Sequence, residues 1–217
     1  MPDLDFKILG VTAAARGMVP LLHFDVELRS PAGAETVQGV LLHAQVQIQC
    51  PQRSHSPSEK ERLSELFGPP ERWGQTLRNL LWTHAHTTVG AFAGHARAVL
   101  PIPCTYDLHV AASKYFYALE GGEVPLLFLF SGSIFYAPAE GSLQVQQISW
   151  NKEAVYRLPV KVWHDLMQHH FPNSAWLYLR RDVFDRLYAY KRAQGLATWE
   201  EALERLLPAD RPEEVAA

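Results

Sequence analysis

The stretch that decides the fold reads Val40-Leu41-Leu42-His43-Ala44-Gln45-Val46-Gln47-Ile48-Gln49. Its even-numbered positions are all apolar, and most of the positions between them are polar. Because successive side chains of a β-strand point to opposite faces, this alternation predicts a strand with one buried side and one solvent-facing side. A single wet face is typical of antiparallel sheets.

The same alternation recurs through the first two thirds of the chain. We expect further strands over residues 4–8, 22–29, 83–89, 94–100, 106–119, 124–136 and 143–150. Ser30-Pro31-Ala32-Gly33 predicts a hairpin turn between the second and third strands. Short strands separated by turn residues at this spacing predict an α+β, mainly β fold: an antiparallel β-sandwich with an inserted helix and C-terminal helices.

The inserted helix is expected near residues 57–67. Ser56 and Glu59 form a capping-box pattern, Pro57 occupies the first helical position, and Phe67-Gly68 ends the helix. From about Val155 the apolar spacing becomes helical. Helices are expected to begin at Pro159, to be capped by Asp182, and to begin again at Thr198, after a short extended piece over residues 176–179.

These patterns predict a sandwich over residues 1–157, a helical segment over 158–209 packed on it, and a frayed tail over 210–217. The apolar faces of the C-terminal helices are too large to leave in water. We expect them to dock on a sheet face carrying Leu108, Val110 or Tyr115, so that the chain unfolds as one cooperative unit. The alternative is that these helices recruit a partner.

Composition excludes several classes of protein. The chain has 217 residues, 47% of them hydrophobic and 20% charged, and a net charge of −3, so no global field attracts nucleic acid. No apolar run reaches the roughly 18 residues of a membrane span, and the first residues do not resemble a signal peptide. Two cysteines, Cys50 and Cys104, fit a reducing compartment and predict buried free thiols. A cytoplasmic protein is expected.

A histidine pair is the candidate chemical site. His84 and His86 are two residues apart on one predicted strand, so they share a face. They are either the beginning of a metal site or polar residues on a wet face. Side chains that could complete a metal site are His43, His95, His109, Asp107 and Cys104. The chain has no His-Glu-x-x-His or Cys-x-x-Cys motif to support the metal hypothesis.

Other chemistry has weaker support. Cys50 and Cys104 lack the helix start that lowers a thiol pKa, and Ser131-Gly132-Ser133 lacks the Gly-x-Ser-x-Gly pattern of a nucleophile elbow. No phosphate-binding glycine loop is present. The basic stretch from Arg180 to Arg192 is interpreted as a solvated helix face. We therefore predict no catalytic residue and no cofactor, and a non-enzymatic role over an enzymatic one.

Several motifs resemble a bacterial family with a conserved domain of unknown function. They are Cys50-Pro51, His55-Ser56-Pro57, Leu66-Phe67-Gly68, Arg72-Trp73-Gly74-Gln75, Trp82-Thr83-His84, Pro101-Ile102-Pro103-Cys104, Pro125-Leu126-Leu127-Phe128 and Phe171-Pro172-Asn173-Ser174. The resemblance covers nearly the whole chain. Members are often encoded beside the high-affinity, oxygen-insensitive type of nickel–iron hydrogenase, which implies an accessory role near that enzyme and transfers no catalytic residue.

The leading prediction is a cytoplasmic, non-enzymatic accessory or interaction protein linked to hydrogenase assembly, maturation or electron transfer. Its partner would be a protein, such as hydrogenase subunits or their accessory proteins, with a homo-oligomer as an open alternative. The second hypothesis is a metal- or small-ligand-binding protein, including an enzyme, that uses the strand face of His84 and His86.

Overall fold

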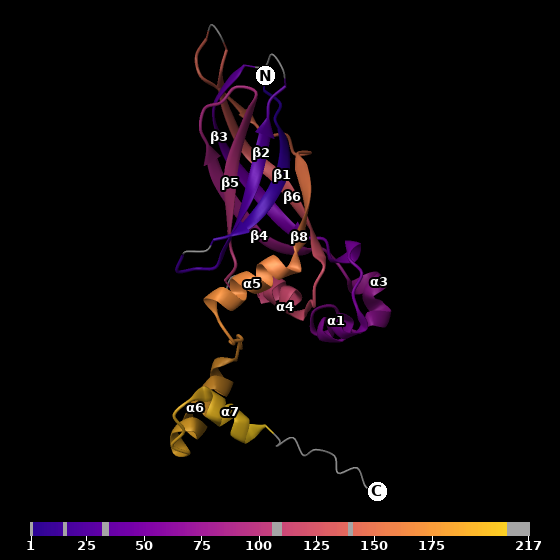
Figure 1. Cartoon of the computed structure of the whole chain (residues 1–217), viewed down its shortest axis with the longest axis vertical. Coiled ribbons are helices and arrows are strands. Elements are labelled where there is room, and N and C mark those ends of the chain that lie inside the picture. The colour runs from indigo at the N-terminus through magenta and orange to yellow at the C-terminus, as the bar shows by residue number, and fades with distance from the viewer. Residues whose placement is uncertain (1, 15–16, 32–34, 106–109, 139–140, 208–217) are drawn as a thin grey trace. The chain divides into compact units, whose positions relative to one another are not determined.

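The alternating segments form two antiparallel sheets that face each other across a shared core (Figure 1). The structure is a computed structural model that describes residues 2–14, 17–31, 35–105, 110–138 and 141–207. The chain divides into two compact units, Met1–Ser174 and Ala175–Ala217. Both sheets belong to the first unit.

The first sheet has the strand order β1 (Asp5–Ala13), β2 (Leu21–Arg29) and β5 (His95–Pro103). In the central strand β2, Leu22, Phe24, Val26 and Leu28 are buried, as their alternation predicted. Their neighbours in the sequence face outward. Register pairs Phe24 with Val11 of β1 and with Leu100 of β5.

The second sheet has the order β4 (Leu80–Val89), β3 (Thr36–Ile48) and β6 (Glu123–Ala137). The first half of β6 also pairs with β8 (Glu153–Pro159), and its second half pairs with β7 (Gln144–Gln147). Gly132 lies between these halves with φ +130, and a Cβ there would come within 1.9 Å of the Leu41 carbonyl oxygen. A glycine is therefore required for β6 to approach β3 at this point.

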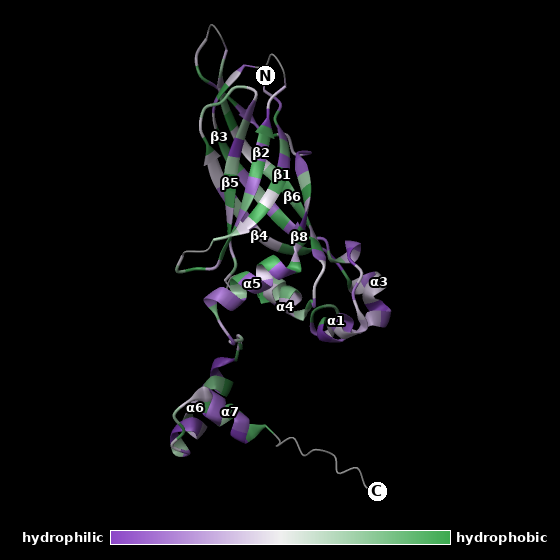
Figure 2. Cartoon of the chain, viewed as in Figure 1, coloured by the Kyte–Doolittle hydropathy of each residue, from purple (hydrophilic) through white to green (hydrophobic). Residues whose placement is uncertain are grey.

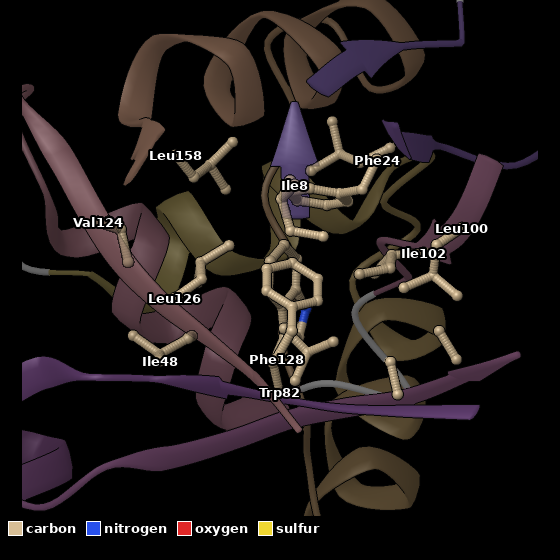
Figure 3. Packing of buried hydrophobic residues seen from close by; sticks show 14 of the residues in the cluster. Ile8, Phe24, Ile48, Trp82, Leu100, Ile102, Val124, Leu126, Phe128 and Leu158 are labelled. Carbon is tan, nitrogen blue, oxygen red and sulfur yellow. The ribbon is translucent and has the colours of Figure 1, made fainter. Parts of the chain in front are cut away.

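Aromatic rings from both sheets meet in the core (Figure 3). The Phe24 ring of β2 packs edge-on against Phe128 of β6 at 5.2 Å and against Trp82 of β4 at 6.5 Å. Phe6 of β1 stacks on Phe130 of β6 at 4.5 Å. Each large side chain buried in this way stabilises the fold by roughly 1.5–3 kcal/mol. The outward residues of the strands give them their alternating hydrophilic bands (Figure 2).

The helices complete the predicted fold class. The inserted segment contains the 3₁₀ turns η1 (Cys50–Gln52) and η2 (Pro70–Arg72) and the helices α1 (Pro57–Arg62), α2 (Ser64–Phe67) and α3 (Trp73–Thr76). The Ser56 capping box with Glu59 is confirmed, and Gly68 ends α2 with a positive φ of 74. An antiparallel β-sandwich with an inserted helical segment and C-terminal helices is therefore confirmed.

The predicted strand over residues 106–119 is wrong. Residues 106–109 lie outside the described residues, and Val110–Ala118 form the helix α4. Its buried residues are Ala112, Ser113, Tyr115, Phe116 and Ala118, and Ala112, Tyr115 and Phe116 share one helix face with Leu119 just beyond the helix. Alternation and helical spacing overlap in this segment because most of its residues are apolar.

The first C-terminal helix, α5 (Val160–His170), belongs to the first unit. It lies with α4 across one end of the strands (Figure 1). The Trp163 ring stacks on Phe116 of α4 at 5.2 Å, and the His164 ring is hydrogen-bonded to the Phe116 carbonyl at 3.0 Å. α5 therefore packs on residues of the expected segment, but this segment is the helix α4 and not a strand. Cooperative unfolding of the whole chain stays a prediction.

Three smaller expectations are corrected. Ser30 and Pro31 do not lead into a hairpin, because β2 pairs only within the first sheet and β3 within the second among the described residues. Residues 153–159 are the strand β8, where a helical period was expected from Val155. Helix α6 (Arg181–Ala193) begins after Arg180, so Asp182 lies in its first turn and is not its cap.

No helix among the described residues combines the length and the apolar character needed to cross a bilayer.

Candidate functional site

Three histidines lie on the outward face of the second sheet. His84 and His86 of β4 are both exposed, which confirms the shared face that their spacing predicted. Strand register places His43 of β3 opposite His86, and their ring centres are 6.1 Å apart at an interplanar angle of 38°. His84 lies opposite Gln45. Of the histidines proposed to join the pair, the structure thus brings His43 to it.

The surroundings of these histidines are neutral. Ser131 of β6 lies opposite His43 on the other side of β3, and Thr88 follows His86 on the same face of β4. The outward face of the first sheet is different, because Lys7, Glu27 and Arg97 lie side by side across its three strands. A hydrogen bond from Arg29 at 2.9 Å lowers the pKa of Glu27. The direct cross-strand neighbours of the histidines are therefore uncharged, while the exposed charges Glu153 and Arg157 of the second sheet lie on β8, beyond β6.

The other proposed metal ligands are not brought together with the histidines. Cys104 is buried after β5, where burial raises the pKa of its thiol to about 12. His95 lies in the first sheet opposite Arg29. Asp107 and His109 lie outside the described residues. Among the residues that are described, no group of three or more His, Cys, Asp or Glu side chains is arranged to hold a metal ion.

A second group of polar side chains lies where the inserted segment meets α4. We call it the buried polar cluster, and it consists of Cys50, Arg53, His55, Glu59 and Tyr115. Its members come from the turn η1, from the residues before α1, from α1 and from α4. The capping box that starts α1 places Glu59 in the cluster, because this carboxylate accepts the Ser56 backbone N–H at 3.0 Å.

The centre of the cluster is a bidentate ion pair. Arg53 donates from Nη1 and Nη2 to the two carboxylate oxygens of Glu59, at 2.9 and 2.8 Å. Arg53 also donates to the Gly121 carbonyl at 2.6 Å, and Glu59 accepts the Glu120 N–H at 3.0 Å. The pair therefore ties the inserted segment to the loop between α4 and β6. Bidentate, charge-assisted bonds of this kind are strong and directional.

Burial of Glu59 by itself raises its pKa. The hydrogen bonds from Arg53 and from the backbone N–H groups of Glu120 and Ser56 outweigh that effect and lower the pKa to about 2. Both side chains of the pair are nearly inaccessible, with 10% exposure for Arg53 and 4% for Glu59. The carboxylate thus stays charged inside the protein because its bonding capacity is used.

Of the remaining members, His55 and Tyr115 are joined by a hydrogen bond, and the Cys50 thiol donates to the Ile48 carbonyl oxygen at 3.7 Å. The His55 Nε2 atom lies 3.0 Å from the Tyr115 hydroxyl, and Tyr115 is completely buried. Burial raises the pKa of the Cys50 thiol to about 12, although the neighbouring Tyr115 hydroxyl lowers it by hydrogen bonding. Burial and the nearby Arg53 charge lower the pKa of His55. The thiol is therefore protonated and the imidazole neutral at physiological pH.

This arrangement is suited to holding structure together. A protonated, buried thiol is a poor nucleophile, and the prediction that Cys50 and Cys104 are buried and free is confirmed. Sequence analysis found the capping box but missed the cluster. The pattern Cys50-Pro51-x-Arg53-x-His55 could have indicated the cluster. Burying an arginine or a histidine beside a buried cysteine costs free energy unless each has a hydrogen-bond partner.

The second unit carries an exposed aromatic cluster. Phe184 and Tyr188 of α6 and Trp199 at the start of α7 (Trp199–Leu206) have ring centres 5.3 to 6.3 Å apart. Lys191 lies 5.6 Å from the centre of the Trp199 ring. Phe184 is nevertheless 44% exposed and Tyr188 47%. This unit therefore leaves much of its apolar surface in water.

A groove of about 610 Å³ follows this cluster. Its lining consists of residues 177–181 together with Phe184, Leu187, Trp199 and Leu203. Leu177 and Tyr178 on one side of it are 67% and 81% exposed. The Thr198 capping box, with Glu201, is confirmed and fixes the start of α7 beside the groove. The floor is apolar, and Arg180 and Arg181 bring positive charge to it.

Two facing antiparallel sheets, an inserted helical segment and a separate pair of helices define an α+β protein in which strands predominate. Residues 1–215 match the Family of unknown function (DUF6084), and the chain belongs to this family. This confirms the resemblance to a family of unknown function. No curated protein matches the chain.

Among solved structures, the chain is similar to the solution structure of a putative late embryogenesis abundant (LEA) protein. The sequence identity is 12%, the match covers 73% of each chain, and the TM-score is 0.30.

Proposed function

We propose that this protein is a non-enzymatic interaction protein whose second unit binds a protein partner through the groove beside α6 and α7. The observation that carries the proposal is the exposure of that groove: Leu177, Tyr178 and Phe184 all remain largely or partly in solvent. Contiguous exposed apolar surface on a monomer marks an interaction site. Aromatic residues are also enriched in protein interfaces.

The partner segment that fits best is an amphipathic helix. A groove between two short helices with an apolar floor suits a helix that inserts large apolar side chains at every third or fourth position. Arg180 and Arg181 favour acidic residues beside those apolar positions. Arg180 already contacts Asp182 at 3.1 Å, which holds its guanidinium at the start of α6.

A non-enzymatic role is supported by the state of the polar groups in the first unit. The Cys50 thiol is buried with a raised pKa, and the Glu59 carboxylate already accepts bonds from Arg53 and two backbone N–H groups. A general base or nucleophile needs access to a substrate and a pKa near the working pH. We therefore assign the buried polar cluster a structural role.

The proposed partner belongs to the machinery that assembles, matures or supplies electrons to a nickel–iron hydrogenase. The support is the resemblance of motifs across the chain to a family that is often encoded beside that enzyme. Two buried free thiols fit a reducing compartment, such as the cytoplasm. Hydrogenase subunits and their accessory proteins are the partners to test first.

The experiment measures binding of the full-length chain to purified hydrogenase subunits and to each accessory protein by calorimetry. Leu177→Glu and Phe184→Glu place a charge in the groove and should weaken binding roughly tenfold or more, as loss of an interface anchor does. The control is Val155→Glu on β8, a residue 68% exposed on the sandwich, which should leave affinity unchanged. Equal weakening by all three variants, or binding to none of these proteins, would overturn the proposal.

A further inference from the structure

We propose that His43 and His86 form an open binding site for a divalent transition-metal ion on the outward face of the second sheet. The inference is independent of the partner-binding groove, because it rests on the first unit only. It also differs from the pair suggested by sequence spacing, His84 with His86. The cross-strand pair is the one that the register and the ring geometry select.

Distance favours the cross-strand pair. Residues two apart on one strand have Cα atoms separated by about 6.5 Å, and their side chains run parallel. Residues directly opposite on antiparallel strands have Cα atoms about 4.5–5.5 Å apart. His43 and His86 are such a directly opposite pair, and their ring centres lie 6.1 Å apart.

The observed ring separation is close to what one metal ion requires. Two imidazoles that share a tetrahedral ion at about 2.0–2.1 Å from each nitrogen have ring centres roughly 5 Å apart. The two rings in the structure are already inclined at 38°. Both histidines are exposed, so small side-chain rotations can close the remaining distance without disturbing the core.

The backbone beneath the pair is held firmly. Strand β3 is paired on both sides, with β4 and with β6, so His43 is on an interior strand of the sheet. At Gly132 the strand β6 approaches β3 so closely that a Cβ would lie 1.9 Å from the Leu41 oxygen and 3.5 Å from Cδ2 of His43. Ligands on a rigid scaffold lose less entropy when they bind an ion.

The surroundings suit a cation with an incomplete protein ligand set. Ser131 opposite His43 and Gln45 opposite His84 are neutral and carry oxygen atoms that can bond to metal-bound water. Two imidazoles leave the other coordination positions to water or to a ligand from solution. Imidazole ligands suit Zn²⁺ and Cu²⁺, and the Irving–Williams order places Cu²⁺ above Zn²⁺.

The test is titration of the untagged full-length chain with Cu²⁺ and with Zn²⁺ by calorimetry. One equivalent should bind, Cu²⁺ more tightly than Zn²⁺. His43→Gln or His86→Gln should each weaken binding roughly tenfold or more, because either change removes the gain from joining two ligands. His84→Gln should change the affinity less than about threefold. Electron paramagnetic resonance of the one-equivalent Cu²⁺ complex should show coupling to two imidazole nitrogens, and it needs no variant.

A second histidine pair provides a matched control. His169 and His170 at the end of α5 have ring centres only 5.3 Å apart, but their ring planes are perpendicular and the Nε2 atom of His170 is buried. His169→Gln should leave the affinity unchanged. The proposal is overturned if His43→Gln binds as tightly as the unaltered chain, if His84→Gln weakens binding as much as His86→Gln, or if His169→Gln removes the site. Coupling to one nitrogen would also overturn it.

Discussion

The buried polar cluster and the histidine face carry similar functional groups in opposite states. In the cluster, Arg53 and Glu59 are nearly inaccessible and make several hydrogen bonds each. On the face, His43 and His86 stand in solvent with neutral neighbours. Removing one partner from a buried, hydrogen-bonded polar group is costly, whereas exposed groups remain available for ligands. The comparison predicts large stability effects in the cluster and small ones on the face.

Removing the charge of Arg53 should have the largest effect. Arg53→Met leaves the Glu59 carboxylate buried without its partner, and breaking a buried pair in this way costs about 3–5 kcal/mol. Urea denaturation at neutral pH measures the loss. The control is Arg62→Met, whose pair with Glu120 is 48% and 47% exposed and should contribute about 0–1 kcal/mol. Equal losses in the two variants would remove the distinction between buried and exposed pairs.

Acid should destabilise the protein through the same cluster. The pKa of Glu59 is about 2 in the folded chain against an ordinary value of 4.5, so its contribution is complete above pH 4.5 and is lost as the pH falls toward 2. The lowered pKa of His55 acts in the same direction, because the folded state resists its protonation.

Melting temperatures measured between pH 7 and pH 3 should therefore fall. Glu59→Gln should start lower and fall less steeply, since glutamine does not titrate. If the melting temperature of Glu59→Gln falls with pH as steeply as that of the unaltered chain, the acid sensitivity comes from other carboxyl groups. Candidates are Glu27 and Glu120, whose pKa values are also lowered.

A single hydroxyl should have an intermediate effect. Tyr115→Phe keeps the buried ring but removes the hydroxyl that is hydrogen-bonded to His55 at 3.0 Å. The expected loss is about 1 kcal/mol, the usual net value of one hydrogen bond. Tyr117→Phe on the same helix is the control, because Tyr117 is 70% exposed. A loss above that of Arg53→Met, or no loss at all, would contradict the order proposed for the cluster.

The histidine face should give the smallest stability effect. His84→Ala combined with His86→Ala replaces two exposed side chains, and such changes usually shift stability by less than about 0.5 kcal/mol. Thermal denaturation in metal-free buffer measures it. A loss of several kcal/mol would mean that these histidines support the sheet, and the contrast with the buried polar cluster would then disappear.

Much of the fold followed from local patterns. The alternation of Leu22, Phe24 and Val26 predicted the buried face of β2, because strand geometry fixes which side chains share a face. The capping boxes of Ser56 and Thr198 were also found, since each depends on residues three positions apart. The shared face of His84 and His86 was predicted for the same reason as the face of β2.

The sequence prediction failed where a local pattern was compatible with both a strand and a helix. Residues 110–118 are mostly apolar, so they satisfied the alternation of a strand as well as the spacing of a helix. Packing decides between them: Phe116 lies 5.0 Å from the Trp82 ring and 5.2 Å from the Trp163 ring, and helix geometry also brings Tyr115 to His55. None of these contacts is visible in a window of nine residues.

The amino-acid pattern was sufficient for the buried face of strands such as β2 and β3, for the capping boxes of α1 and α7 and for the free state of the two thiols, because these depend on neighbours in the chain or on overall composition. Which distant residues contact each other was decided only by the folded chain. His43 lies opposite His86 because of the register of β3 on β4, and Arg53 is hydrogen-bonded to Gly121, which is 68 residues away in the sequence. Pairings between distant segments depend on register and packing across the whole core, and no local periodicity encodes them.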